Sequence, residues 1–279
     1  MCAPVISIII PIYGVERYIG RFAESVLGQK YPHIQFVFVN DGTKDNSMQI
    51  LDDLIKEKYS HLKERIIIIN KENGGLPSAR KTGMKYVTGD YVWHIDSDDW
   101  IEEDAVQKIA DFTVSQNFPD VIYFDFFKEY TDKTKLKRER EYTTGEKDKY
   151  IINMFNHDSY ACVWNKCVRR RVYIDNEVAF PRFSYAEDTY LTTQLVGYAD
   201  RICHLAQPLY HYRKDNPLAI TRQNSRKRHR EYALNFLDLY ERYKDVPIER
   251  NPVSVILRQM LRRVRWYNLI YHLGIFRKR

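Results

Sequence analysis

The sequence predicts an α/β fold in which a central, mainly parallel sheet is flanked by helices. Three observations support this fold class. Over the first hundred residues, short apolar runs rich in β-branched residues alternate with segments of helical periodicity. The apolar runs are nearly continuous, which is typical of strands buried on both faces. The chain has 279 residues, 44% of them hydrophobic, which is enough to form such a core.

The expected elements of this region follow one another in regular alternation. Strands are expected at 5–10, 34–39, 66–69 and 91–95. Helices are expected at 16–27 and 78–87, and a third helix between them is expected to begin at a cap formed by Asn46 or Ser47. The first strand is too short to span a bilayer and is ended by Pro11. Strands joined by helices imply right-handed crossovers and ligand binding at the carboxyl ends of the strands.

Two of those strand ends carry acids. Asp41 follows the second expected strand, and Asp96, Asp98 and Asp99 follow the fourth. We therefore expect both groups to open onto one crevice. Hard carboxylate oxygens in this number suit Mg²⁺ or Mn²⁺ bridging to phosphate, and a solvated acidic turn is the alternative. Neither of the common glycine-rich phosphate loops is present, so a nucleotide would be held in another way.

The second half of the chain is less regular. A helix is expected at 102–114, a strand at 121–127, a charged surface segment at 128–149, a helix at 188–199, and long amphipathic helices at 226–244 and 253–271. The net charge is +7, but from Arg222 onward 15 Lys and Arg face 5 Asp and Glu, so the basic character belongs to the tail. No nucleic-acid partner is expected, because the rest of the chain is slightly acidic.

The four cysteines are few and unevenly spaced, which indicates a reducing compartment and a cytoplasmic protein. The basic tail leaves alternatives open. Residues 250–279 have the composition of a basic amphipathic helix. Such a helix can contact the inner face of the cell membrane, pack its apolar stripe on the rest of the protein, or bind a protein or nucleic-acid partner.

Several segments, read together, resemble a known family. They are PIYGVERYI at 11–19, VNDGTKDNS at 39–47, NGGLPSARKTG at 73–83 and GDYVWHIDSDDW at 89–100, followed more loosely by VWNKCVRR at 163–170, FSYAEDTYL at 183–191 and YHYRKDNPLAIT at 210–221. In order and spacing they are similar to the signature segments of the family 2 inverting glycosyltransferases. Gly14, where many members have Asn, and Pro77 are the visible departures.

The resemblance implies a GT-A type fold that transfers a hexose from a nucleoside diphosphate sugar, usually a UDP-sugar, to a glycan or lipid-linked glycan acceptor in bacterial surface polysaccharide synthesis. It implies a catalytic domain at 1–221, with a nucleotide-binding half at 1–100 and an acceptor half at 101–221, before a basic helical extension at 222–279. A sugar nucleotidyltransferase and a non-catalytic nucleotide-sugar binding module are the alternatives.

The resemblance also implies roles for individual residues. Pro11 and Tyr13 would shape the base pocket and stack on the base, and Asp41 would accept a hydrogen bond from the base. The nucleotide site would also be lined by Glu16, Arg80 and Ser97. Asp96 would contact the ribose, and Asp98, with Asp96, would hold Mn²⁺ or Mg²⁺. For Tyr13 the alternative is a core or turn tyrosine. For Arg80 it is a solvated charge on a helix.

Inversion requires a base on the sugar face opposite the leaving diphosphate, and Glu187-Asp188 is the candidate pair. Neighbouring residues on a helix point about 100° apart, so only one of the two can face the donor. The apolar spacing around them does not choose between them. The resemblance favours Asp188 as the base and Glu187 as the residue that orients it, and the alternative is an acid pair that stabilises a helix N-terminus.

Overall fold

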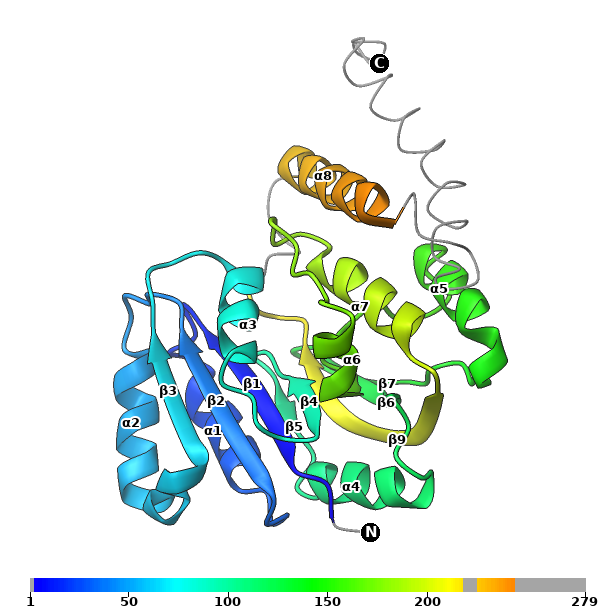
Figure 1. Ribbon diagram of the computed structural model, residues 1–279. Helices are drawn as coiled ribbons and strands as arrows, with labels where there is room; N and C mark the ends of the chain where they lie inside the picture. Colours follow the sequence, from blue (N-terminus) through cyan, green and yellow to red (C-terminus); the bar gives the residue numbers. More distant parts are fainter. Residues whose placement is uncertain (1–2, 218–224, 244–279) are drawn as a thin grey trace.

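A computed structural model describes residues 3–217 and 225–243, and within them one twisted sheet of nine strands forms the centre of the molecule (Figure 1). The strands are β1 (Ile6–Ile12), β2 (Ile34–Asn40), β3 (Ile66–Asn70), β4 (Tyr91–His94), β5 (Trp100–Ile101), β6 (Val121–Glu129), β7 (Thr134–Lys137), β8 (Lys166–Arg169) and β9 (Ile202–Arg213). Their order is β3-β2-β1-β4-β8-β6-β9-β5, with β7 paired to the edge of β6.

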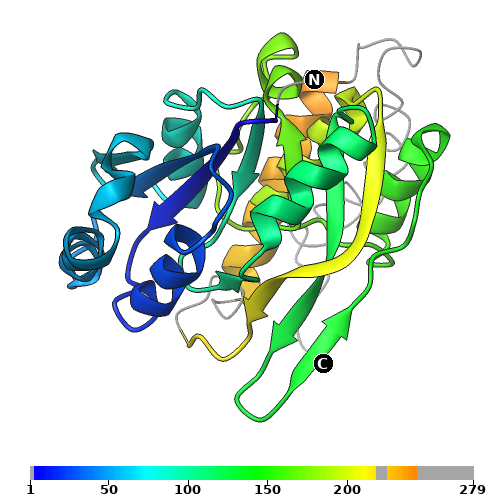
Figure 2. The ribbon, with the colours of Figure 1, turned by 90° about the horizontal axis from the view of Figure 1, so that it is seen from below.

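Helices cover both faces of this sheet (Figure 2). The α-helices are α1 (Ile19–Leu27), α2 (Ser47–Lys58), α3 (Leu76–Met84), α4 (Ala105–Ser115), α5 (Lys147–Phe155), α6 (Arg170–Asp175), α7 (Glu187–Tyr198) and α8 (Ser225–Tyr243), and the 3₁₀ turns are η1 (Ser60–Arg65) and η2 (Thr144–Glu146). One core cluster joins α1, α2 and α4 to the sheet. The other joins α3, α5, α6, α7 and α8 to it.

The pairings among the first four strands are all parallel. β1 pairs in parallel with β2 on one side and β4 on the other, and β2 pairs in parallel with β3. In the second half, β6 pairs in parallel with β9, while β8 pairs antiparallel with β4 and β6. Most paired residues lie in parallel ladders. The predicted α/β fold with a mainly parallel sheet is confirmed.

The expected helical face of α1 is confirmed as well. Its buried residues recur at the spacing that places them on one side of a helix: Ile19, Phe22, Ala23, Val26 and Leu27. The predicted start of this helix at Glu16 is wrong, because residues 13–18 form a loop that is bonded to the loop after β2. Helix α3 likewise ends before the predicted limit at Val87.

The charged segment 128–149 is only partly the surface excursion that its composition predicts. It contains the end of β6, strand β7 and the start of α5. Glu139, in this segment, is buried. Its side chain accepts a hydrogen bond from Asn165 Nδ2 at 2.7 Å, and its N–H donates to Asp125 at 2.8 Å. Long-range polar contacts of this kind leave no periodic signal in the local sequence.

Helix α8 lies across α7 and is the described part of the predicted C-terminal helical extension (Figure 1). Asn235 Nδ2 donates to the carbonyl groups of Phe183 and Tyr185, and Glu231 accepts from Tyr185 N–H. The helix thus fixes the loop that leads into α7. The expected helix at 253–271 lies outside the described residues. Within the described ranges, every helix is too short or too polar to cross a bilayer.

Candidate active site

The loop after β1 is tied to the loop after β2. Gly14 has a φ of +68°, and its N–H donates to Thr43 Oγ1 at 2.8 Å. Glu16 accepts a hydrogen bond from the N–H of Asn46 at 3.0 Å. Because glycine adopts positive φ without a steric penalty, its presence in place of the usual Asn preserves this loop. The predicted contact of Glu16 with the nucleotide stays a prediction, since its carboxylate bonds to the neighbouring loop.

Tyr13 and Pro11 stand at the carboxyl end of β1 with different exposure. Pro11 is buried within the strand, beside Val39 of β2. Tyr13 is 55% exposed, which is unusual for a large aromatic side chain. The alternative of a core tyrosine is therefore wrong, while that of a turn tyrosine stays open, because Tyr13 lies in the loop after β1. An exposed ring at this end of the sheet is free to stack on a ligand.

Asp41 is buried and holds the glycine loop that precedes α3. Its carboxylate accepts hydrogen bonds from the N–H groups of Gly74 at 3.0 Å and Gly75 at 2.8 Å, and from Lys71 Nζ at 2.5 Å. Gly75 has a φ of +83°, so this turn requires glycine. The predicted hydrogen bond from a base stays a prediction. The structure adds that Asp41 organises the turn from which α3 begins.

Helix α3 packs very closely on the sheet. A Cβ atom at Gly83 would lie 2.6 Å from a methyl group of Ile9 in β1, so only glycine fits there. This close packing places the preceding turn of α3, which contains Arg80, next to the carboxyl end of β4. Arg80 is completely buried. The alternative of a solvated helix charge is therefore wrong for this residue.

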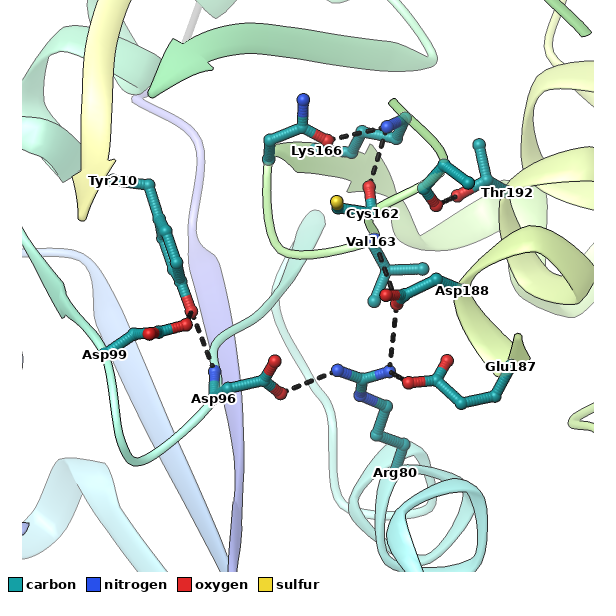
Figure 3. A network of polar contacts seen from close by, with 12 residues as sticks. Arg80, Asp96, Asp99, Cys162, Val163, Lys166, Glu187, Asp188, Thr192 and Tyr210 are labelled. Carbon is teal, nitrogen blue, oxygen red and sulfur yellow. Dashed lines mark hydrogen bonds and ion pairs between the residues drawn. The ribbon is translucent and has the colours of Figure 1, made fainter. Parts of the chain in front are cut away.

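Arg80 joins three carboxylates from two distant segments (Figure 3). One terminal nitrogen donates to Asp96 at 2.7 Å, and the other donates to Glu187 at 2.7 Å and Asp188 at 3.3 Å. Burial alone would lower the pKa of the guanidinium, but the carboxylates, Glu187 first, raise it above its usual value. Arg80 is thus a permanent cation between the acidic turn after β4 and the start of α7.

The acidic turn after β4 consists of residues 96–99, and its four side chains make different contacts. Ser97 Oγ is buried and donates to the carbonyl of Pro11 at 2.7 Å, which ties the turn to β1. Asp99 is buried as well and accepts from Tyr210 Oη at 2.6 Å and from Arg213 N–H at 2.7 Å. Asp99 is therefore committed to structure. The predicted ligand contact of Ser97 stays a prediction, and its hydroxyl already has a partner.

Asp96 and Asp98 are the acids of this turn that keep an oxygen for a ligand. Asp96 Oδ1 binds Arg80, and Asp98 Oδ2 accepts from Asn216 Nδ2 at 2.6 Å. Burial raises the pKa of Asp96 to about 6, although the Arg80 charge opposes this. Among the described residues no group of three His, Cys, Asp or Glu side chains forms a metal site. Two carboxylates fit Mg²⁺ or Mn²⁺ where substrate phosphates and water complete the coordination.

The two candidate bases differ sharply in exposure. The Glu187 side chain is 6% exposed, and burial raises its pKa well above the usual value. The Asp188 side chain is 29% exposed, and its Oδ1 accepts from the N–H of Val163 at 3.2 Å. The exposure differs in the sense that the resemblance favours, and the assignment of Asp188 as the base stays a prediction. Asp188 is accessible to a substrate, and Glu187 is buried behind it.

The segment that supports Asp188 was not assigned a role from the sequence. Lys166 Nζ is buried and donates to the carbonyl groups of Tyr160 at 3.0 Å and Cys162 at 2.7 Å (Figure 3). Thr192 of α7 donates to Ala161 at 2.6 Å. These bonds fix the chain on both sides of the Val163 N–H. In the sequence this support is marked by Lys166 within the segment VWNKCVRR. The burial of that lysine is visible only in the structure.

The comparisons with known proteins agree with this architecture. Residues 7–176 match the family model described as glycosyl transferase family 2. EpsJ of Bacillus subtilis, a glycosyltransferase, is 31% identical over 224 residues, which are 78% of this chain and 63% of EpsJ. This chain therefore spans just under two thirds of that relative.

Two solved structures have the same fold at low identity. A fragment of S. aureus TarS, crystallised with UDP-GlcNAc, superposes with a TM-score of 0.69 at 22% identity, over 84% of this chain and 66% of the fragment. The mannosyltransferase PcManGT of Pyrobaculum calidifontis, crystallised with GDP-Man and Mn²⁺, gives 0.62 at 14% identity, over 94% of this chain and 70% of its own. Because the family match covers more than half of the residues, the chain belongs to glycosyl transferase family 2.

Proposed function

We propose that this protein is an inverting glycosyltransferase that moves a sugar from a nucleoside diphosphate sugar, UDP-linked by preference, to a hydroxyl group of a glycan or lipid-linked glycan. One observation carries the proposal. A single buried arginine, Arg80, holds an accessible carboxylate, Asp188, on one side and the acidic turn at Asp96 on the other. Arg80 thus brings the proposed base close to the proposed diphosphate site.

The donor would be held at the carboxyl end of the parallel strands. Tyr13 offers its exposed ring to the base, and Asp41 lies at the next strand end. Asp96 and Asp98 would hold Mn²⁺ or Mg²⁺, which neutralises charge on a departing diphosphate. The ligands in the titles of TarS, UDP-GlcNAc, and of PcManGT, GDP-Man with Mn²⁺, support a nucleotide-sugar donor and a divalent ion.

The base function follows from the environment of Asp188. Its Oδ1 accepts hydrogen bonds from Val163 N–H and Arg80, and the side chain is 29% exposed. Oδ2 can accept the proton of an acceptor hydroxyl as that oxygen attacks the anomeric carbon from the face opposite the diphosphate. Glu187 and Arg80 keep the carboxylate in position. One displacement with no covalent intermediate inverts the anomeric carbon.

The decisive experiment is a screen of UDP- and GDP-sugars for Mn²⁺-dependent hydrolysis and for transfer to glycan acceptors. We expect Asp188→Asn to bind the donor normally and to transfer sugar at least about 10²-fold more slowly, because a positioned base contributes that much. Glu187→Gln is the matched control and should lose less. A large loss in Glu187→Gln with normal transfer by Asp188→Asn would assign the base to the other carboxylate.

Two results of the same screen would favour the alternatives. Formation of a nucleotide sugar from a sugar phosphate and a nucleoside triphosphate would indicate a sugar nucleotidyltransferase. Donor binding without hydrolysis or transfer would indicate a binding module. For the basic residues 250–279 we propose peripheral contact with an anionic membrane at its inner face, because their sequence composition is that of a basic amphipathic helix.

A further inference from the structure

Four lysines lie on one face of the sheet near the end of β6. Residues paired across neighbouring strands point to the same side, and so do alternate residues along a strand. Lys128 of β6 pairs with Lys135 of β7 and with Tyr212 of β9. Lys137 follows Lys135 by two positions, and Lys214 Nζ lies 3.5 Å from Tyr212 Oη. We call Lys128, Lys135, Lys137 and Lys214 the lysine face.

The lysine face lies beside the candidate base. Lys128 Nζ is 4.9 Å from the centre of the Tyr160 ring, and Tyr160 begins the segment whose Val163 N–H donates to Asp188. The charges of Lys128 and Asp188 both act on the Cys162 thiol, so the two side chains lie in the same part of the molecule, within reach of one oligosaccharide. Tyr212 pairs with Lys128 in the sheet, and its phenol also lies near Asp188. Burial raises the pKa of its phenol, and nearby negative groups, Asp188 among them, raise it further.

Three lysines of this face, Lys128, Lys135 and Lys137, have no acidic partner among the described residues. In residues 3–217 and 225–243, no carboxylate forms an ion pair with Lys128, Lys135 or Lys137. Lys133, on the same hairpin, does pair with Asp132. Burial, helped by the nearby charges of Lys137 and Lys214, lowers the pKa of Lys128. Lys128 and Lys137 are half-buried and Lys135 is exposed. Neighbouring cations without a carboxylate partner repel one another, and an anionic ligand would relieve that repulsion.

We propose that the lysine face binds an anionic group of the acceptor, a phosphate or a carboxylate carried by the glycan near the hydroxyl that receives the sugar. The inference rests on the proposed function, because it takes Asp188 as the base for that hydroxyl. Ammonium groups bind such anions as point charges. The rings of Tyr160 and Tyr212 border the same region and offer apolar surface to a sugar.

The first test compares matched acceptors on the full-length protein: a neutral glucoside, the same glucoside with a 6-phosphate, and the corresponding glucuronide. We expect the anionic acceptors to be preferred at low salt, and Lys128→Met to reduce kcat/KM for them about tenfold, since one charged contact has about that value. The change should appear in KM. Metal-dependent donor hydrolysis and the neutral acceptor should be unaffected by the substitution.

A matched control removes the same charge elsewhere. Lys108 on α4 is paired with Asp104, far along the chain from the lysine face, and Lys108→Met should leave every acceptor unchanged. Equal use of neutral and anionic acceptors by the wild-type protein would overturn the inference while normal donor hydrolysis leaves the proposed function intact. An equal loss in both variants would also overturn it, because the effect would then be general.

A binding measurement decides the question without turnover. Calorimetry should show glucose 6-phosphate binding to the protein more tightly than glucose, and Lys128→Met should remove that difference. If the protein hydrolyses no donor, this result still stands for the lysine face while the proposed function fails. If Lys128→Met instead weakens binding to anionic phospholipid vesicles and leaves glucose 6-phosphate binding unchanged, the lysines contact a membrane and the inference is wrong.

Discussion

Replacement of Arg80 with methionine removes the positive charge between three carboxylates and keeps an unbranched side chain that fills the inner part of the same space. The expected loss of folding free energy is set by the Arg80–Glu187 pair, because both side chains are buried and Arg80 Nη1 lies 2.7 Å from Glu187 Oε1. Loss of one partner of a buried pair costs about 3–5 kcal/mol, since the other charge is left uncompensated. In a chain of this size we expect a fall in Tm of roughly 6–20 °C.

The loss of stability in Arg80→Met, relative to the wild-type protein, should depend on pH. Burial raises the pKa of Glu187 well above its usual value, and loss of the nearby cation raises it further. A carboxyl with a raised pKa binds its proton more tightly in the folded state than in the unfolded state, so stability falls as pH rises between the two values. Because the pKa of Glu187 is already raised in the wild-type protein, the deficit of the variant should be smallest at low pH and should grow as pH rises from the wild-type folded-state pKa of Glu187 to its higher value in the variant.

Urea and thermal unfolding followed by circular dichroism measure these quantities. Lys81→Met is the matched control, because Lys81 is the next residue on α3 and is exposed. Glu187→Gln in the Arg80→Met background should restore part of the stability, since it removes the uncompensated charge. A fall of less than about 2 °C in Tm, or a deficit that does not change with pH, would refute the view that buried charge pairing stabilises this site.

Three further predictions concern the donor site and the tail. Asp98→Asn should fold normally and lose Mn²⁺-dependent donor binding, and unchanged affinity in calorimetry would remove Asp98 from the metal site. Because the pKa of Asp96 is about 6, protons should compete with the metal, so donor affinity should fall about tenfold per pH unit below that value, and a flat profile from pH 7 to pH 5 would contradict this. Deletion of residues 250–279 should abolish co-sedimentation with anionic vesicles at low salt, and equal binding by the shortened chain would show that the tail is not the membrane contact.

Much of the fold was predictable because its signals are local. The four strands expected between residues 5 and 95 agree with the structure to within one or two residues, since each is a continuous apolar run. The buried face of α1 follows from helical spacing alone. The error at Glu16 has a physical cause. Its carboxylate bonds to Asn46, thirty positions away, so that residue belongs to a loop and not to the first turn of α1.

The sequence by itself determined the α/β fold class, the acids at the strand ends and the pair of candidate bases. Only the tertiary structure decided that Arg80 is a buried link, that Asp99 is structural and that Asp188, not Glu187, is open to a substrate. The reason is that periodicity records which side of an element is apolar. The burial and charge state of Arg80 and Glu187 depend on a contact between residues 107 positions apart, and no local pattern encodes it.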